Sequence, residues 1–149
     1  MISKILVPSD GSKTAQRAAG YAVDLAKQLK ASIIALSVID KRSFIVQPVP
    51  ASETARHAIE PIEDYLREAA EAYTGEIKKL CDKNGVASKI SIKMGHPVEE
   101  IVKEAKRSKA NLIIMGSHGR SALSATVLGS VSYGVLHNDK NIPILIVRG

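Results

Sequence analysis

The sequence predicts an α/β fold, namely an open five-stranded parallel sheet with helices on both faces, of the Rossmann-like kind. Along the 149 residues, short apolar runs alternate with longer amphipathic segments in the order β-α-β-loop-α-β-α-β-α-β. This alternation is typical of parallel strands joined by crossover helices. Most of the runs are apolar throughout, which indicates strands that are covered on both faces. We expect residues 1–149 to form one such domain.

Five short runs have the length and residue types of strands. They are KILVP (4–8), SIIALSVI (32–39), SKISIKM (88–94), NLIIM (111–115) and IPILIV (142–147). The third run alternates polar and apolar residues, which predicts a strand less buried than the others. Ligands of parallel sheets bind beyond the carboxyl ends of the strands, at the point where the strand order reverses.

Helical periodicity predicts helices after the first and third strands and before the last. Ser12 is a candidate N-cap, and apolar residues then recur at spacings of three and four over residues 15–29. Pro97 suits the first turn of another helix. Apolar residues before the last strand predict a helix over about residues 127–137.

The middle of the chain predicts one long helix and one long connection. Pro61 suits the first turn of the helix, whose apolar face extends from Ile62 to Leu80. Residues 40–60 show no clean period and contain prolines, so we expect a long loop there, with a helical turn near 52–59. A loop of this length in a compact domain is usually functional or mobile.

The basic charge of the chain raises the question of nucleic-acid binding. The net charge is +6, and residues 1–50 carry +4, residues 51–100 carry −3 and residues 101–149 carry +5. No dense lysine and arginine run is present, and aromatic residues make up only 3% of the chain. The most basic stretch, KEAKRSKAN (103–111), is typical of a solvated helix end. We therefore expect no nucleic-acid partner.

Other sequence features favour a cytoplasmic protein. Cys81 is the single cysteine, which excludes an internal disulfide and fits a reducing compartment. The N-terminal stretch has no long apolar segment, so we expect no signal peptide. The apolar runs are also much shorter than the roughly 18 residues that a membrane span needs. On these grounds we expect no membrane partner.

The stretch MGSHGRSALSATVLGSVS (115–132) is rich in glycine and hydroxyl residues and has Arg120 as its one charge. Its glycines follow the pattern G-x2-G-x9-G, with a serine next. Glycines let backbone approach a ligand and adopt positive φ, and exposed N–H groups before a helix N-terminus bind anions. Composition alone leaves a phosphate site and a plain turn equally open. The P-loop and dinucleotide motifs are both absent.

This stretch resembles the signature of the ATP-binding branch of the universal stress protein family, G-x2-G-x9-G-[ST]. KILVPSDGS (4–12), ANLIIMGSHGRS (110–121) and GSVSYGVLHNDKNIPILIVRG (129–149) are similar to other parts of that family. The resemblance implies an adenine-nucleotide alpha hydrolase-like sheet with strand order 3-2-1-4-5. It also implies ATP as the ligand, with Mg²⁺ or Mn²⁺ bound through its phosphates, and a homodimer formed through residues 142–147.

The resemblance further implies the role of each candidate site residue. Asp10 would hold the ribose hydroxyls beside Pro8, the backbone of Val38 would meet the adenine edge, and Met115 would pack on the nucleotide. The phosphates would bind backbone groups and hydroxyls of Gly116, Gly119, Gly129, Ser130, Val131 and Ser132. From the residues alone, a turn or helix-start aspartate is the favoured interpretation of Asp10, and Arg120 either reaches a phosphate or lies in solvent.

The sequence also departs from the family pattern. Ala122 stands where the family often has glycine, and a basic residue often found near positions 125 and 126 is missing. Tyr133 and Gly134 stand where charged residues are common, and a glycine there weakens a helix by about 1 kcal/mol relative to alanine. We expect the missing basic side chain to weaken the hold on the terminal phosphate.

The sequence does not indicate a dedicated enzyme. ATP hydrolysis needs a group that positions water, and no carboxylate lies between Glu104 and Asp139. His118 is the one titratable side chain within the motif besides Arg120, and we assign neither a catalytic residue nor a metal ligand. We expect an ATP-binding regulatory or stress-response module with slow hydrolysis or phosphate transfer at most. The alternative is a structural, dimerising module of the same fold that does not bind nucleotide.

Overall fold

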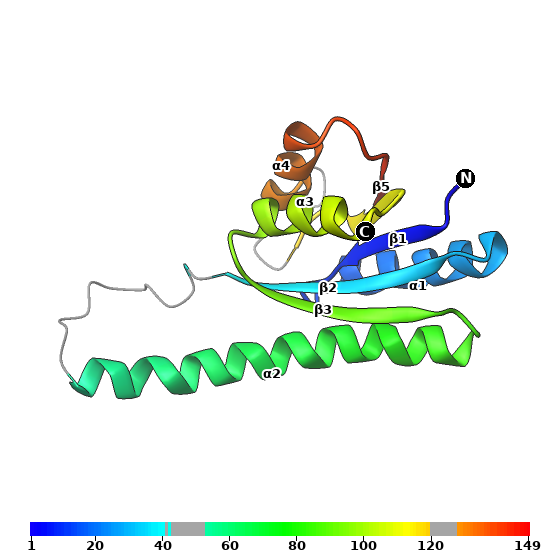
Figure 1. Cartoon of the computed structure of the whole chain (residues 1–149). Coiled ribbons are helices and arrows are strands. Elements are labelled where there is room, and N and C mark those ends of the chain that lie inside the picture. The colour runs from blue at the N-terminus through cyan, green and yellow to red at the C-terminus, as the bar shows by residue number, and fades with distance from the viewer. Residues whose placement is uncertain (41, 43–52, 120–127) are drawn as a thin grey trace.

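The computed structural model describes residues 1–40, 42, 53–119 and 128–149, and of residues 53–61 it describes the backbone alone. Strands and helices alternate along the chain as predicted (Figure 1). The elements are β1 (Lys4–Pro8), α1 (Lys13–Leu29), β2 (Ser32–Asp40), α2 (Glu53–Lys83), β3 (Ser88–Gly95), α3 (Pro97–Ser108), β4 (Leu112–Gly116), α4 (Ser130–Asn138) and β5 (Ile144–Val147).

The strands form one sheet in the order β3-β2-β1-β4-β5, and each described pairing is parallel. The predicted order 3-2-1-4-5 is therefore confirmed. The direction of winding reverses between β1 and β4, which are neighbours in the sheet although far apart in the sequence. The segments that follow these two strands consequently emerge side by side, where parallel sheets bind ligands.

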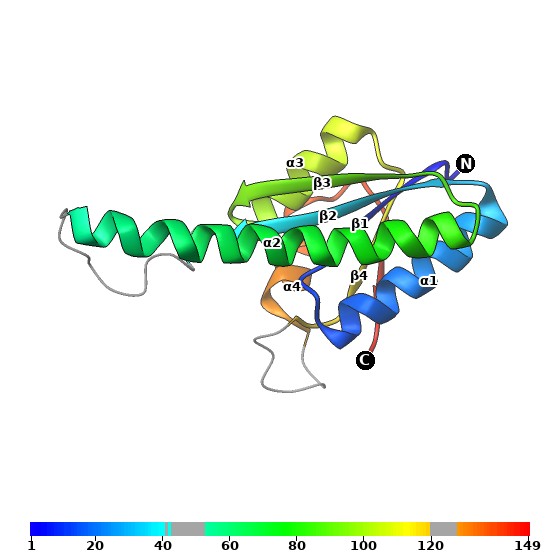
Figure 2. The same cartoon turned by 90° about the horizontal axis from the view of Figure 1, so that it is seen from below.

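Helices cover both faces of the sheet (Figures 1 and 2). Helices α1 and α2 pack on one face, where alanines of α1 and Ile77 and Cys81 of α2 meet the strands. Helices α3 and α4 cover the other face through Ile101, Ala105 and Val135. The central strands are buried on both sides, which explains their continuous apolar sequences. The edge strand β3 is more exposed, as its alternating pattern predicted.

The long helix begins earlier than predicted. Helix α2 starts at Glu53. The helical turn expected near 52–59 is therefore part of one continuous helix, and the expectation of a loop over the rest of 53–60 is wrong. The residues before Pro61 include alanine, glutamate and arginine, which favour helix. A proline removes one intrahelical N–H donor and costs about 3 kcal/mol, and the helix nevertheless continues through it. The remainder of the predicted loop, apart from Asp40 and Arg42, lies outside the described residues.

Two further predictions need correction. Ile62, predicted to face inward, is 42% exposed, and its neighbour Tyr65 is 70% exposed, because the N-terminal part of α2 extends past the strands (Figure 1). Helix α4 begins at Ser130 rather than near residue 127, with Gly129 as its N-cap. In the part of the chain that the structure describes, no helix is long and apolar enough to cross a membrane.

Candidate functional site

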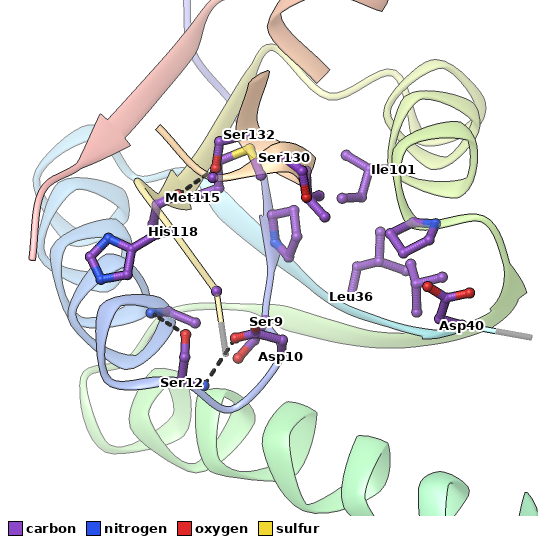
Figure 3. A pocket seen from close by; sticks show the side chains of 18 of the residues that line it. Ser9, Asp10, Ser12, Leu36, Asp40, Ile101, Met115, His118, Ser130 and Ser132 are labelled. Atoms are coloured by element: carbon purple, nitrogen blue, oxygen red, sulfur yellow. Dashed lines mark hydrogen bonds between the residues drawn. The ribbon is translucent and has the colours of Figure 1, made fainter. Parts of the chain in front are cut away.

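A pocket of about 630 Å³ opens at the carboxyl ends of the central strands (Figure 3). Its walls come from the β1–α1 turn, from β2, from the N-terminus of α3 and from the segment that joins β4 to α4. Every predicted site residue within the described ranges lines it: Pro8, Asp10, Val38, Met115, Gly116, Gly119, Gly129, Ser130, Val131 and Ser132. Arg120 lies outside the described residues.

The β1–α1 turn presents Asp10 to the pocket. Asp10 Oδ1 accepts a hydrogen bond of 2.9 Å from the Ser12 N–H, which is the turn role that the residues alone favour. Asp10 Oδ2 lies against Gly119, because a Cβ at Gly119 would lie 2.3 Å from it. The carboxylate therefore both closes the turn and reaches across to the glycine-rich segment (Figure 3).

A glycine and a tyrosine hold this turn in place. Gly11 has φ of +77°, a left-handed conformation that favours glycine. The Tyr73 ring from α2 packs directly on it, since a Cβ at Gly11 would lie 2.2 Å from Tyr73 Cε1. Ser12 then caps α1, because its side chain accepts from the Ala15 N–H. The side chain of Ser12 thus satisfies one of the N-terminal N–H donors of helix α1.

The three motif glycines provide space rather than unusual backbone angles. Among the described glycines, positive φ occurs at Gly11, Gly85 and Gly95. The expectation that the motif glycines adopt positive φ is therefore wrong. A Cβ at Gly116 would lie 3.0 Å from Thr14 atoms, and one at Gly129 would lie 2.9 Å from His118 Cα. Gly116 lets the segments after β1 and β4 pack against one another. Gly129 instead packs within the β4–α4 segment, where its N–H donates a 2.6 Å hydrogen bond to the Ser117 carbonyl.

The N-terminus of α4 lacks a side-chain cap. Gly129 is its N-cap, with φ −64° and ψ 157° and no capping side chain, in contrast to Ser12 on α1. Among the described residues, no hydrogen bond is made by the N–H groups of Ser130, Val131 or Ser132, and such first-turn groups can bind water or a ligand. Ser132 Oγ donates a 2.7 Å hydrogen bond to the Gly116 carbonyl, so its hydroxyl ties α4 to the end of β4.

The whole chain matches a known family. A model of the universal stress protein family matches residues 1–148. The chain belongs to this family. It is 36% identical to Universal stress protein MJ0577 of Methanocaldococcus jannaschii over 157 aligned positions, which cover 99% of this chain and 96% of the relative. It is 33% identical to Universal stress protein MJ0531 of the same organism over 148 residues, which cover 99% of this chain and 83% of the relative.

Solved structures of the family show the same fold. The structure of MJ0577 superimposes with a TM-score of 0.85 at 34% identity and covers 100% of this chain and 97% of its own. A universal stress protein solved in complex with cAMP has a TM-score of 0.71 at 25% identity, with 99% of this chain and 97% of that chain covered. The five-stranded arrangement is therefore that of the universal stress proteins.

Helix α4 of this universal stress protein contains Gly134, where the family often has a charged residue. The structure supplies a reason: a Cβ at Gly134 would lie 2.6 Å from Val98 Cγ2 on α3. The glycine allows α3 and α4 to approach closely. Both helices line the pocket at their N-terminal ends.

Sequence reasoning missed several residues that line the pocket, among them Leu36, Asp40 and Ile101. A signal for two of them was present. Leu36, Val38 and Asp40 occupy alternate positions of β2, and alternate residues of a strand share one face of the sheet. Once Val38 is assigned to the site, its two neighbours on that face follow.

Asp40 is the second carboxylate among the described lining residues. Arg42 Nη2 lies 2.7 Å from Asp40 Oδ2, and Arg42 Nε donates to both carboxylate oxygens. This guanidinium holds the pKa of Asp40 below its ordinary value, and the charges of Arg42 and His96 act in the same direction. Asp40 therefore stays ionised at neutral pH.

His118 also lines the pocket, at the end opposite Asp40 (Figure 3). Its Nδ1 lies 3.0 Å from Ser117 Oγ, and its backbone carbonyl accepts a hydrogen bond from the Thr14 hydroxyl. The ion pairs found among the described residues do not include His118. The described contacts thus anchor this histidine through the loop, and they give it no carboxylate partner of the kind that a catalytic triad uses.

Proposed function

We propose that this universal stress protein binds ATP in the pocket and acts as a regulatory or stress-response module. One observation carries the proposal. Residues from distant stretches of the sequence, singled out by the motif and by the wider family resemblance, line a single pocket at the switch point of the sheet. A relative of the same fold has been solved with cAMP, which supports an adenine nucleotide as the ligand class.

The residues present fit such a ligand. The phosphates suit the end of the pocket formed by Gly119, Gly129 and the uncapped N-terminus of α4, because the first-turn N–H groups of α4 there meet an anion. The Gly129 N–H itself is bonded to the Ser117 carbonyl. Asp10 suits the ribose, since a carboxylate accepts hydrogen bonds from two hydroxyls. Apolar residues of β2, α3 and β4 line the remainder of the pocket and suit the faces of the base. A bound Mg²⁺ or Mn²⁺ would be held through the phosphates.

We expect hydrolysis or phosphate transfer to be slow at most. Of the two described carboxylates in the pocket, Asp10 lies in the turn and Asp40 lies at the far end from the glycines (Figure 3). Asp10 Oδ2 lies against Gly119 at the phosphate end, but we assign this carboxylate to the ribose hydroxyls. With Asp40 at the other end, no described carboxylate is left to position water beside a terminal phosphate. Replacement of His118 by alanine should leave any slow turnover within about twofold, whereas a large loss would assign it a catalytic role.

Calorimetric titration with ATP and Mg²⁺ tests the proposal. We expect micromolar binding by the wild-type chain, which Asp10→Ala and Gly129→Ala weaken. Asp82→Ala is a matched control, because Asp82 is an exposed carboxylate that pairs with Lys78 on α2, away from the pocket. An absence of both heat and thermal shift in the wild-type chain would reject nucleotide binding and favour the structural module.

The open edge of β5 supports the proposed homodimer. Val147 accepts from Ser117 N–H across the β4–β5 ladder, and Pro143 accepts from Ile113 N–H. The backbone N–H and C=O groups of alternate residues in a strand point to opposite sides. Those of Ile144 and Ile146 therefore face away from β4. An apolar edge of this kind is usually paired, and a second β5 strand would pair with it. Sedimentation at micromolar concentration should show a dimer, and a monomer would contradict this assignment.

A further inference from the structure

The pocket has two chemically different ends. The glycines and the α4 N-terminus form one end, and Asp40, at the carboxyl end of β2, forms the other. In Figure 3, Asp40 lies beside Leu36 and Ile101, on the side away from His118 and Ser12. A ligand whose phosphates occupy the glycine end and whose base follows the apolar wall therefore extends toward Asp40.

The Asp40 carboxylate is held in a defined orientation. Arg42 contacts it through three side-chain hydrogen bonds of 2.7–3.1 Å, and the Arg42 backbone N–H donates to Oδ1 at 2.9 Å. The Asp40 side chain is 25% exposed and that of Arg42 is 68% exposed. The arginine therefore lies on the solvent side, while the carboxylate lines the pocket.

An ionised carboxylate accepts hydrogen bonds and donates none. A carboxylate has about four acceptor sites, and the three N–H groups of Arg42 reach all four only because Nε–H is shared between Oδ1 and Oδ2. A ligand N–H therefore gains a site when Nε–H bonds to a single oxygen. A base that presents an N–H to this group gains a charge-assisted hydrogen bond. A base that presents a carbonyl oxygen instead places an acceptor against an anion, which is unfavourable.

We propose that Asp40 is a specificity-determining residue that selects purines with an amino group at position 6 over purines with a carbonyl there. The inference rests on the proposed function, since it assigns the base end of the same site. Beyond nucleotide binding itself, the proposal names the side chain that contacts the base and the group on the base that it recognises. Asp40 acts by direct contact with the base, whereas Arg42 is a positioning residue for its carboxylate.

Titration of the full chain with three nucleoside triphosphates tests the rule. ATP carries a 6-amino group, purine riboside triphosphate carries hydrogen at position 6, and inosine triphosphate carries a carbonyl. A hydrogen bond to a charged group predicts that ATP binds the wild-type chain about tenfold to a hundredfold more tightly than the 6-hydrogen analogue. Inosine triphosphate should bind more weakly still.

Two variants of Asp40 separate its role from a structural one. In Asp40→Ala, ATP affinity should fall to that of the 6-hydrogen analogue, whose own affinity should stay within about twofold of wild type. In Asp40→Asn, the amide can donate to a carbonyl, so the preference for ATP over inosine triphosphate should shrink or reverse. Asp82→Ala is the control, and it should retain the wild-type preference.

Three results would overturn the inference. The first is equal affinity of the wild-type chain for ATP and the 6-hydrogen analogue. The second is an unchanged preference for ATP in Asp40→Ala. The third is tighter binding of GTP than of ATP, because the carboxylate would then recognise the N1–H and 2-amino groups of guanine. If the wild-type chain and the Asp82→Ala control bind no nucleotide at all, the proposed function itself fails together with the inference.

Discussion

Replacement of Gly134 by alanine should destabilise this protein, although the same change usually stabilises a helix. A Cβ at Gly134 would lie 2.6 Å from Val98 Cγ2 and 3.2 Å from Val98 Cγ1. Valine in a helix has one strongly preferred χ1 rotamer, so Val98 cannot rotate away at low cost. Helices α3 and α4 must instead move apart.

The magnitude follows from two opposing terms. Alanine in a helix interior is favoured over glycine by about 1 kcal/mol, whereas overpacking a tight contact costs about 1–3 kcal/mol. The free energy of unfolding should therefore fall by about 1 kcal/mol. For a chain of this size that corresponds to a decrease in Tm of about 2–4 °C.

Two other helical glycines serve as matched controls. A Cβ at Gly20 in α1 or at Gly75 in α2 would enter open space, with no atom within 4 Å, so Gly20→Ala and Gly75→Ala should gain about 0.5–1 kcal/mol. Urea unfolding followed by circular dichroism measures the free energy of unfolding of Gly134→Ala, Gly20→Ala and Gly75→Ala. In a Val98→Ala background the penalty of Gly134→Ala should disappear. A gain in stability for Gly134→Ala equal to that of Gly20→Ala would refute the reasoning.

Three further predictions concern the turn, an ion pair and the sheet edge. Gly11→Ala should lower the urea midpoint and the ATP affinity, because its Cβ would meet the Tyr73 ring and its φ is +77°. Hydrogen bonding to Arg107 lowers the pKa of Glu104 in the folded chain. The ionised carboxylate therefore stabilises the fold above the unfolded pKa of Glu104, and this stabilisation is lost as the pH falls through the lowered folded pKa. The free energies of unfolding of wild type and Glu104→Gln should converge in acid. Ile146→Pro should reduce the dimer fraction in sedimentation, since it removes an edge N–H.

Much of the fold was predictable because the strands are short apolar runs and the helices between them are amphipathic. The glycine motif and the family resemblance predicted residues that line one pocket in the structure, and their role in holding a nucleotide stays a prediction. The reason for the glycines was not predictable, since composition cannot distinguish a need for positive φ from a need for space. The contacts of Gly116 with Thr14 and of Gly119 with Asp10 depend on pairing between β1 and β4.

Other features depend on tertiary contacts that a sequence pattern does not show. Asp40 belongs to no motif, and apart from its place on the same strand face as Val38 only the pocket indicates its importance. In the sequence, Gly134 is simply a residue that weakens a helix. The structure shows that glycine is needed there because Val98 packs directly against it. The early start of α2 was missed because Pro61 is a strong helix-start signal, and a proline inside a helix is rare enough to be discounted.

Amide chemical shifts during titration with ATP and Mg²⁺ test the central claim most directly, because backbone N–H groups are proposed to hold the phosphates. The largest shifts are expected at Gly119, Gly129 and Ser130, with further shifts at Val38 on the base side, and they should saturate at micromolar ligand. Shifts confined to other surfaces, or an unchanged spectrum at saturating ATP, would rule out a phosphate site at the N-terminus of α4.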